Sequence, residues 1–302
     1  MNKSTRQLTC ILMFSIANFF SFAQKKIVVF QSDFGLKDGA VSAMKGVAMG
    51  VATDLNLFDL THEIPAYNIW EAAYRLEQTV PYWPAGTVFV SVVDPGVGTN
   101  RKSVVMKTSS GQYIVTPDNG TLTLIASSLG IAAIREIDEA TNRRKGSETS
   151  YTFHGRDVYA YTAARLASGA ISFEQVGKLL PNEVVKLNYQ QADMDGPKKI
   201  KGTVAILDVQ YGNVWTNISS DLFREFEPKI GDKIQVKIFH GKQKVYDGVM
   251  PYSATFGEVP KGKPLLYMNS LMQVSFALNM ASFSSVYKVY SGSDWTVEIS
   301  KK

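Results

Sequence analysis

The sequence predicts an α/β protein of two domains: a mainly parallel α/β sheet domain, followed by a C-terminal antiparallel β-barrel-like domain. From about residue 25 to 190, short apolar runs alternate with segments of helical period, which is typical of a parallel sheet covered by helices. From 201 to 302, apolar and polar residues alternate in short runs between Gly, Pro, Asn and Asp, as in antiparallel sandwiches and barrels. We expect the two domains at 24–195 and 196–302.

The elements of the N-terminal domain follow from its apolar runs and its helical periodicity. The expected strands are the buried-type runs 26–34, 55–62 and 86–94. The expected helices are 38–52, 68–80 and about 155–168, with Pro81 ending the second. A hairpin is expected at 103–120, between the third strand and the last helix.

The C-terminal domain is expected to consist of short strands punctuated by turn residues. These strands share an alternation of apolar and polar side chains, and they are 202–210, 233–239, 244–250, 264–270, 286–292 and 295–300. No internal repeat is present in the sequence.

The first residues have the pattern of a secretory signal peptide. Lys3 and Arg6 precede the apolar run 8–20. Small residues, Ser21 and Ala23, stand at the two positions that a signal peptidase recognises before a cleavage site. We expect cleavage after Ala23 and export to the periplasm or the medium, with an uncleaved membrane anchor as the alternative. Cleavage lowers the formal net charge from +5 to +3, which is too small and scattered to indicate a nucleic-acid partner.

The composition excludes several kinds of chemistry. The only cysteine, Cys10, lies in the signal segment, so the mature chain has no disulfide, thiolate nucleophile or Cys-ligated zinc. Three histidines, His62, His154 and His240, are too few for a His-rich metal site. We therefore expect no metal and no other cofactor.

Several carboxylates follow the expected strands. Ligands in open α/β sheets bind at the carboxyl ends of the strands, where Asp33, Asp59 and Asp94 stand. Asp38 opens the first helix, either as a cap or as a ligand. The turn DPGVG after the third strand places Arg101 seven residues beyond Asp94. A polar strand end beside a surface arginine is the alternative to a functional pair.

Two further stretches carry side chains suited to a small-molecule site. His154 precedes a glycine at an expected helix start, where it is either a hydrogen-bonded loop residue or a proton-handling group facing a cleft. In 208–217, DVQYGNVWTN, Tyr211 offers a stacking face and Asn213 an amide that both donates and accepts. A ring such as adenine requires both, although an ordinary strand and turn would have the same pattern.

Taken together, the motifs resemble one known family. SDFGLKDG, DLTHEIP, VVDPGVGTNR, TPDNG, TFHGRD and YGNVWTN occur in this order between residues 26 and 300. In this the chain resembles the S-adenosyl-L-methionine (SAM) hydroxide adenosyltransferases, which are adenosine-forming SAM hydrolases related to the fluorinase and chlorinase.

The resemblance implies an activity and a catalytic triad. Water attacks the ribose 5′ carbon of SAM and releases adenosine and L-methionine, and the family's Asp, Arg and His fall on Asp94, Arg101 and His154. The halogenating relatives carry Tyr in place of the aspartate and other residues in place of His-Gly. Asp94 and His154 therefore indicate water rather than halide as the nucleophile.

The resemblance also implies the substrate contacts. Asp33 matches the residue that holds the ribose hydroxyls, Tyr211, Phe256 and Asn213 match the adenine contacts, and Asp38, Asp208 and Ser270 match the methionine end. The full set of implied substrate-binding residues is Asp33, Asp38, Tyr67, Phe153, Asp208, Tyr211, Asn213, Phe256, Ser270 and Met280.

One residue of this chain departs from the family's pattern. The halogenases have an Arg after the matching serine, near the methionine carboxylate, where this chain has Leu271. The resemblance also implies the assembly. It is a homotrimer, with each site between the first domain of one subunit and the second domain of its neighbour.

Two alternative functions stay open at this point. A non-catalytic adenosine- or SAM-binding protein needs Asp33, Asn213 and the aromatic side chains but not the triad. A metal-dependent hydrolase built on Asp33, Asp38, Asp94 and His154 would lose activity on chelation.

Overall fold

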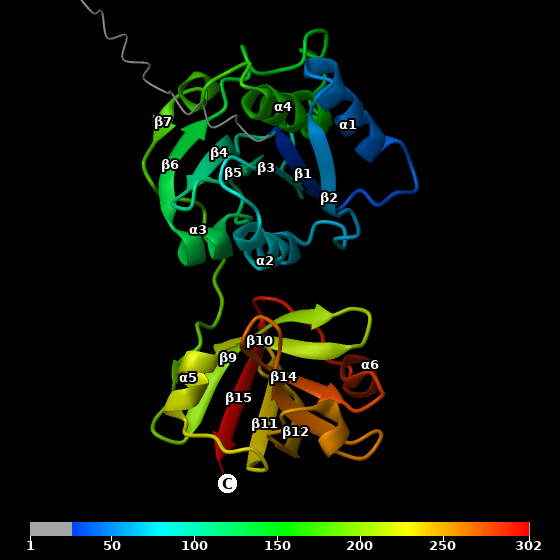
Figure 1. Ribbon diagram of the computed structural model, residues 1–302, viewed down its shortest axis with the longest axis vertical. Helices are drawn as coiled ribbons and strands as arrows, with labels where there is room; N and C mark the ends of the chain where they lie inside the picture. The colour runs from blue at the N-terminus through cyan, green and yellow to red at the C-terminus, as the bar shows by residue number, and fades with distance from the viewer. Residues whose placement is uncertain (1–25, 302) are drawn as a thin grey trace, which may run out of the picture.

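Two sheets follow one another along the chain, and each is the centre of one domain (Figure 1). The computed structural model describes residues 26–301. Within this range the N-terminal sheet has the strand order β2-β1-β3-β5-β4-β6-β7, and the C-terminal sheet has the order β12-β11-β15-β9-β10-β14-β13, with β8 pairing on β9.

The N-terminal sheet combines a parallel half with an antiparallel half. Its strands are β1 (Ile27–Ser32), β2 (Asn56–Thr61), β3 (Val88–Val92), β4 (Ser103–Thr108), β5 (Tyr113–Pro117), β6 (Ile131–Glu136) and β7 (Leu179–Leu180). β1 is parallel to β2 and β3, and β3 is parallel to β5. β4 is antiparallel to β5 and β6, and β6 is antiparallel to β7.

Helices cover both faces of this sheet (Figure 1). They are α1 (Ala40–Val51), α2 (Ile69–Thr79), α3 (Thr123–Leu129) and α4 (Tyr161–Ser168), with shorter turns η1 (Val80–Tyr82), η2 (Gly155–Ala160) and η3 (Phe173–Val176). Successive side chains of a strand point to opposite faces. Val28 and Phe30 accordingly pack with α1 and α4, whereas Val29 packs with Leu76 of α2 and Ile125 of α3. Burial on both faces explains why the sequence of β1 is a continuous apolar run.

The C-terminal domain is an antiparallel sheet that curves toward closure. Its strands are β8 (Asp193–Met194), β9 (Lys199–Asp208), β10 (Asn213–Ser219), β11 (Lys233–His240), β12 (Gln243–Pro251), β13 (Pro264–Met268), β14 (Gln273–Leu278) and β15 (Trp295–Lys301), and its short helices are α5 (Ser220–Glu225), η4 (Phe256–Glu258) and α6 (Phe283–Tyr287). A single bridge between Tyr252, just after β12, and Leu266 of β13 joins the two edge strands. The result is barrel-like.

These observations confirm the predicted fold class, an α/β domain followed by an antiparallel β domain. The parallel part is confined to β2-β1-β3-β5, and the predicted hairpin at 103–120 supplies the start of the antiparallel half. The predicted strand at 286–292 is wrong, because α6 ends within it and a loop follows. Ser282 caps α6 by accepting a hydrogen bond from Ser285 N, and Phe283 and Tyr287 pack one turn apart with ring centroids 4.6 Å from each other.

Helix α2 joins the two domains. The Trp70 indole Nε1 donates to Ala205 O of β9 at 2.7 Å, and the Tyr74 hydroxyl donates to Gln273 Oε1 of β14 at 3.2 Å. Trp70, Tyr74, Ala205 and Ile206 are members of one apolar cluster that spans the junction. In Figure 1, α2 and α3 lie on the side of the N-terminal sheet that faces the C-terminal domain.

The predicted signal peptide, 1–23, lies outside the described residues. Among residues 26–301, no helix is both long enough and apolar enough to cross a membrane.

Candidate active site

The turn after β3 brings Arg101 back onto Asp94. Val97 N donates to Asp94 O at 3.1 Å and Thr99 N donates to Gly96 O at 3.1 Å, so two successive tight turns reverse the chain. Arg101 then donates from Nε to Asp94 Oδ1 at 3.0 Å and from Nη2 to Asp94 Oδ2 at 2.6 Å. The two side chains are only 10% and 5% exposed. This is a bidentate, charge-assisted pair shielded from solvent, not a surface arginine near a strand end.

His154 completes the predicted triad. Its Nδ1 lies 2.8 Å from Arg101 Nη2, and the residue is 4% exposed. His154 immediately precedes the helical turn η2, whose first residue, Gly155, packs against Val92 at the end of β3: a Cβ there would lie 3.2 Å from the Val92 side chain. The absence of a side chain at Gly155 allows the histidine to approach the strand end. The structure therefore brings Asp94, Arg101 and His154 together.

Four more side chains support the triad, and sequence reasoning missed all of them. They are Ser103, Glu139, Arg143 and Tyr159. The Tyr159 hydroxyl donates to Asp94 Oδ2 at 3.2 Å, and Arg101 Nη1 donates to Ser103 Oγ at 3.2 Å. Ser103 lies in β4 and Tyr159 in η2, so the regular spacing of side chains in these elements offered a signal for both residues. Glu139 and Arg143 lie in a segment without periodicity, which offered none.

The electrostatics of the cluster favour an uncharged His154. Burial lowers the pKa of His154, and the guanidinium groups of Arg101 and Arg143 lower it further, against the opposing effects of Glu139 and Asp94. Burial also opposes the charge of Arg101, but its hydrogen bond to Asp94 and the electrostatic effects of Tyr159, Asp94 and Glu139 together outweigh burial, so the pKa of Arg101 is raised. Burial raises the pKa of Tyr159, so its hydroxyl stays a donor.

A cavity of about 230 Å³ opens over Asp94 and His154. Three predicted substrate contacts, Asp33, Tyr67 and Phe153, also line it. Asp33 Oδ2 accepts from Tyr67 N at 2.9 Å, and Tyr67 has a positive φ of 68° with its side chain 73% exposed. Five predicted residues thus share one cavity in the N-terminal domain.

His62 fixes the turn that carries Asp33. Its Nδ1 lies 2.7 Å from Ser32 Oγ, its Nε2 lies 3.0 Å from Asp59 Oδ1, and its carbonyl oxygen accepts from Gly35 N at 2.7 Å. His62 is buried and does not line the cavity. It therefore positions the turn that carries Asp33 and does not face the cavity.

The predicted adenine contacts form a second cavity in the C-terminal domain. Tyr211, Asn213, Phe256 and Met280 line this cavity, whose volume is about 510 Å³. Tyr211 and Met280 are 68% and 77% exposed, whereas Asn213 is buried and donates to Asp208 Oδ2 at 3.2 Å. The two cavities have no lining residue in common.

Two other predicted contacts, Asp38 and Ser270, line neither of these cavities. Asp38 is exposed, and its Oδ1 accepts from Ala40 N at 2.9 Å in the turn that leads into α1, whereas the N-cap position itself is occupied by Gly39. Ser270 and Leu271 line a different cavity, of about 690 Å³, together with Glu71 and Arg75 of α2.

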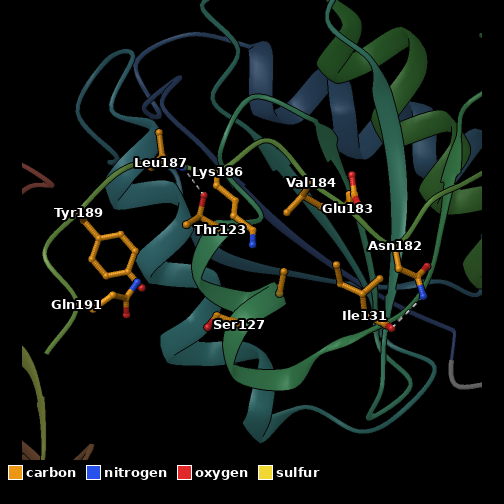
Figure 2. Close-up of a pocket in the computed structure, with 11 residues that line it drawn as sticks. Thr123, Ser127, Ile131, Asn182, Glu183, Val184, Lys186, Leu187, Tyr189 and Gln191 are labelled. Carbon is orange, nitrogen blue, oxygen red and sulfur yellow. Dashed lines mark hydrogen bonds between the residues drawn. The ribbon is translucent and has the colours of Figure 1, made fainter. Parts of the chain in front are cut away.

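A further cavity, of about 430 Å³, lies between α3 and the segment 182–191 (Figure 2). Leu187 N donates to Thr123 Oγ1 at 2.9 Å and Asn182 Nδ2 donates to Ile131 O at 3.5 Å, which holds this segment against the domain. None of the predicted site residues lines it. Among residues 26–301, no three His, Cys, Asp or Glu side chains are grouped as metal ligands would be.

Known proteins share both the sequence and the fold. The profile described as the SAM hydroxide adenosyltransferase N-terminal domain matches residues 28–177, and that of the C-terminal domain matches 202–296. A protein of Methanocaldococcus jannaschii named (R)-S-adenosyl-L-methionine hydrolase is 38% identical, covering 71% of this chain and 74% of its own length. One of the same name from Salinispora tropica is 35% identical, with coverage of 83% and 90%.

More distant in sequence is a fluorinase of Actinopolyspora mzabensis, 28% identical over 89% of this chain and 95% of its own. A solved structure described as an uncharacterized conserved protein from Thermotoga maritima is similar with a TM-score of 0.82 and 35% identity, covering 91% of this chain and all of the other. The chain belongs to the SAM hydroxide adenosyltransferase family.

Proposed function

We propose that this protein hydrolyses S-adenosyl-L-methionine to adenosine and L-methionine by attack of water on the ribose 5′ carbon. The observation that carries this proposal is the buried Asp94–Arg101–His154 cluster beneath a cavity that Asp33 also lines. The relatives named (R)-S-adenosyl-L-methionine hydrolase, at 34–38% identity, support the same reaction.

The chemistry needs a positioned water more than an activated leaving group. The sulfonium of SAM leaves as a neutral thioether and takes the electron pair of the breaking C5′–S bond. Water forms the new C5′–O bond and loses one proton, so each turnover releases one proton. An ionised carboxylate in line with the C–S bond can orient this water and draw on its proton. No metal is required by this chemistry.

The contacts of Asp94 identify the oxygen that remains for the water. Oδ2 accepts from Arg101 Nη2 at 2.6 Å, from Arg101 Nε at 3.1 Å and from the Tyr159 hydroxyl at 3.2 Å. Oδ1 accepts only from Arg101 Nε, at 3.0 Å, among the described residues. Since a carboxylate oxygen has two lone pairs, Oδ1 keeps one for the water.

We further propose that adenine binds at Tyr211, Asn213, Phe256 and Met280 of a neighbouring subunit in a homotrimer. The cavity over Asp94 and His154 and the cavity lined by Tyr211 lie in different domains and share no lining residue. This separation supports a site that is completed by a second chain. The resemblance to the family supports a trimer. Light scattering of the mature protein is expected to give three times the chain mass, and a monomer at assay concentration would count against this part.

We also propose that residues 1–23 are a signal peptide and that the mature protein is exported. The basic, apolar and small-residue order of this segment supports it. N-terminal sequencing of protein recovered from the periplasm or the medium is expected to begin at Gln24.

The deciding assay is incubation of mature protein with SAM, followed by chromatography of the products. Adenosine and methionine are expected in equal amounts. The product should still be adenosine in excess chloride, and the rate of hydrolysis should not change with EDTA. Inhibition by EDTA that a divalent metal rescues would favour a metal-dependent hydrolase. Tight adenosine binding without turnover would favour a binding protein.

A further inference from the structure

His154 lies between two guanidinium groups. Its Nδ1 is 2.8 Å from Arg101 Nη2, and its Nε2 is 3.1 Å from Arg143 Nη2. A guanidinium only donates hydrogen bonds, and so does an imidazolium. In either neutral tautomer one ring nitrogen accepts from a guanidinium, whereas the protonated ring has no acceptor to offer. With His154 4% exposed, solvent does not replace these contacts.

Arg143 is itself firmly held. Its Nη2 donates to Glu139 Oε2 at 2.5 Å, and its Nη1 donates to Ser150 O at 3.1 Å, with 9% of the side chain exposed. The bond to Ser150 ties Arg143 to the segment that leads into His154. The arginine therefore has a fixed direction and is not a mobile surface charge.

Arg143 and Arg101 are connected by two routes. One runs through His154. The other runs through Glu139 and Ser103: Ser103 Oγ donates to Glu139 Oε1 at 3.0 Å and accepts from Arg101 Nη1 at 3.2 Å. A closed ring of polar contacts thus lies behind the Asp94–Arg101 pair, in which a neutral His154 accepts from one guanidinium and has its N–H toward the other. The ring is built from the turn after β3, from β4, from the segment after β6 and from the start of η2.

We propose that Arg143, anchored by Glu139, is a positioning residue that holds His154 neutral and thereby fixes the guanidinium of Arg101 against Asp94. This rests on the proposed function only for the role of Asp94. The charged groups that face His154 are Asp94, Arg101, Glu139 and Arg143, and with a neutral ring they balance. Protonation of His154 adds an uncompensated charge and removes the acceptor on which the orientation of Arg101 depends.

The proposal predicts opposite effects of two substitutions on the same group. Arg143→Met removes a cation beside Nε2 and should raise the pKa of His154. Glu139→Gln removes an anion and should lower it. The chain has only three histidines, so imidazole NMR signals can be assigned by substituting His62 and His240. Arg144→Met is the matched control, because Arg144 pairs with Asp157 and not with His154.

Turnover supplies the second measurement. Arg143→Met should reduce kcat about 10–100-fold, as for outer-shell partners of a metal ligand, while KM for SAM stays near the wild-type value. The acid limb of kcat should move to higher pH in Arg143→Met and to lower pH in Glu139→Gln, and Arg143→Lys should restore part of the rate.

Shifts of the same sign in both variants, or no shift in either, would overturn the proposal. A purely structural role predicts loss of stability in both variants without opposed titrations. If Arg143→Met does not fold, Glu139→Gln still decides, because a raised pKa of His154 in that variant would overturn the proposal. Arg143→Lys keeps the cation and should leave the pKa of His154 near its wild-type value. The NMR titration uses no substrate, so failure of the proposed SAM hydrolysis in the wild-type protein is distinguishable from failure of this proposal.

Discussion

At the residue scale, the two oxygens of Asp94 have different surroundings. Oδ2 is surrounded by donors from Arg101 and Tyr159, and Oδ1 accepts a single contact among the described residues. The bidentate contact with the guanidinium of Arg101 fixes the carboxylate in rotation. The asymmetry therefore gives the proposed water one defined acceptor instead of two equivalent ones.

Replacing Asp94 by Asn tests this assignment. The amide retains the shape but places an NH₂ group against the donors of Arg101, and it lacks the charge that orients water. We expect kcat to fall about 10²–10⁴-fold, the usual range for a general acid–base group, with little change in adenosine affinity by calorimetry. Asp221→Asn, at an exposed ion pair, serves as the control. Near-normal turnover by Asp94→Asn would remove Asp94 from the mechanism.

The central residues of the candidate site could be predicted because their positions follow general rules. Asp94 lies just beyond the carboxyl end of a buried parallel strand, where ligands of open sheets bind, and His154 immediately precedes a helical turn beside it. Arg143 and Glu139 could not be predicted. Their role depends on how an irregular segment folds over the sheet, and neither residue type nor spacing indicates that path.

At the scale of elements, the turn between β3 and β4 determines whether Arg101 meets Asp94. Gly98 has a positive φ of 77°, and a Cβ there would lie 2.9 Å from Tyr151 O. Only glycine tolerates both the backbone conformation and the contact. The close approach also packs the turn against the segment that leads into His154.

Gly98→Ala should therefore impair catalysis more than it impairs stability. The added methyl group clashes with Tyr151 O and displaces the turn, so we expect lower kcat and a modest loss in melting temperature. Gly86→Ala is a matched control, because Gly86 has a positive φ of 85° but open space around its Cβ position. Equal losses of activity in both variants would show that backbone strain alone, not the position of the turn, is responsible.

The elements were predictable where burial dominates the pattern, and less so elsewhere. The continuous apolar run of β1 and the helical period of α2 predict both correctly. The wrong strand at 286–292 begins with alternating apolar residues, but the Ser282 cap and the packing of Phe283 on Tyr287 favour a helical turn at its start. Packing contacts of this kind outweigh a short alternating pattern.

At the scale of the whole molecule, α2 sets the relation between the two domains. The bond from Trp70 Nε1 to Ala205 O is buried, and the indole also packs against Tyr189 with ring centroids 5.1 Å apart. Trp70→Phe keeps an aromatic ring but leaves the Ala205 carbonyl without its donor. We expect a loss of about 1–3 kcal/mol in unfolding free energy by urea titration. Tyr82→Phe, at an exposed ring, should change stability little.

The separation of the two cavities within one chain has a genetic consequence. In the proposed trimer, an allele carrying Asp94→Asn and an allele carrying Asn213→Ala are each defective alone, since every site lacks one half. If equal amounts of the two chains assemble at random, about one site in three of each mixed trimer, or roughly a quarter of all sites, pairs an intact catalytic half with an intact adenine half. Two loss-of-function alleles should therefore complement one another when expressed together, while two alleles altered in the same cavity should not.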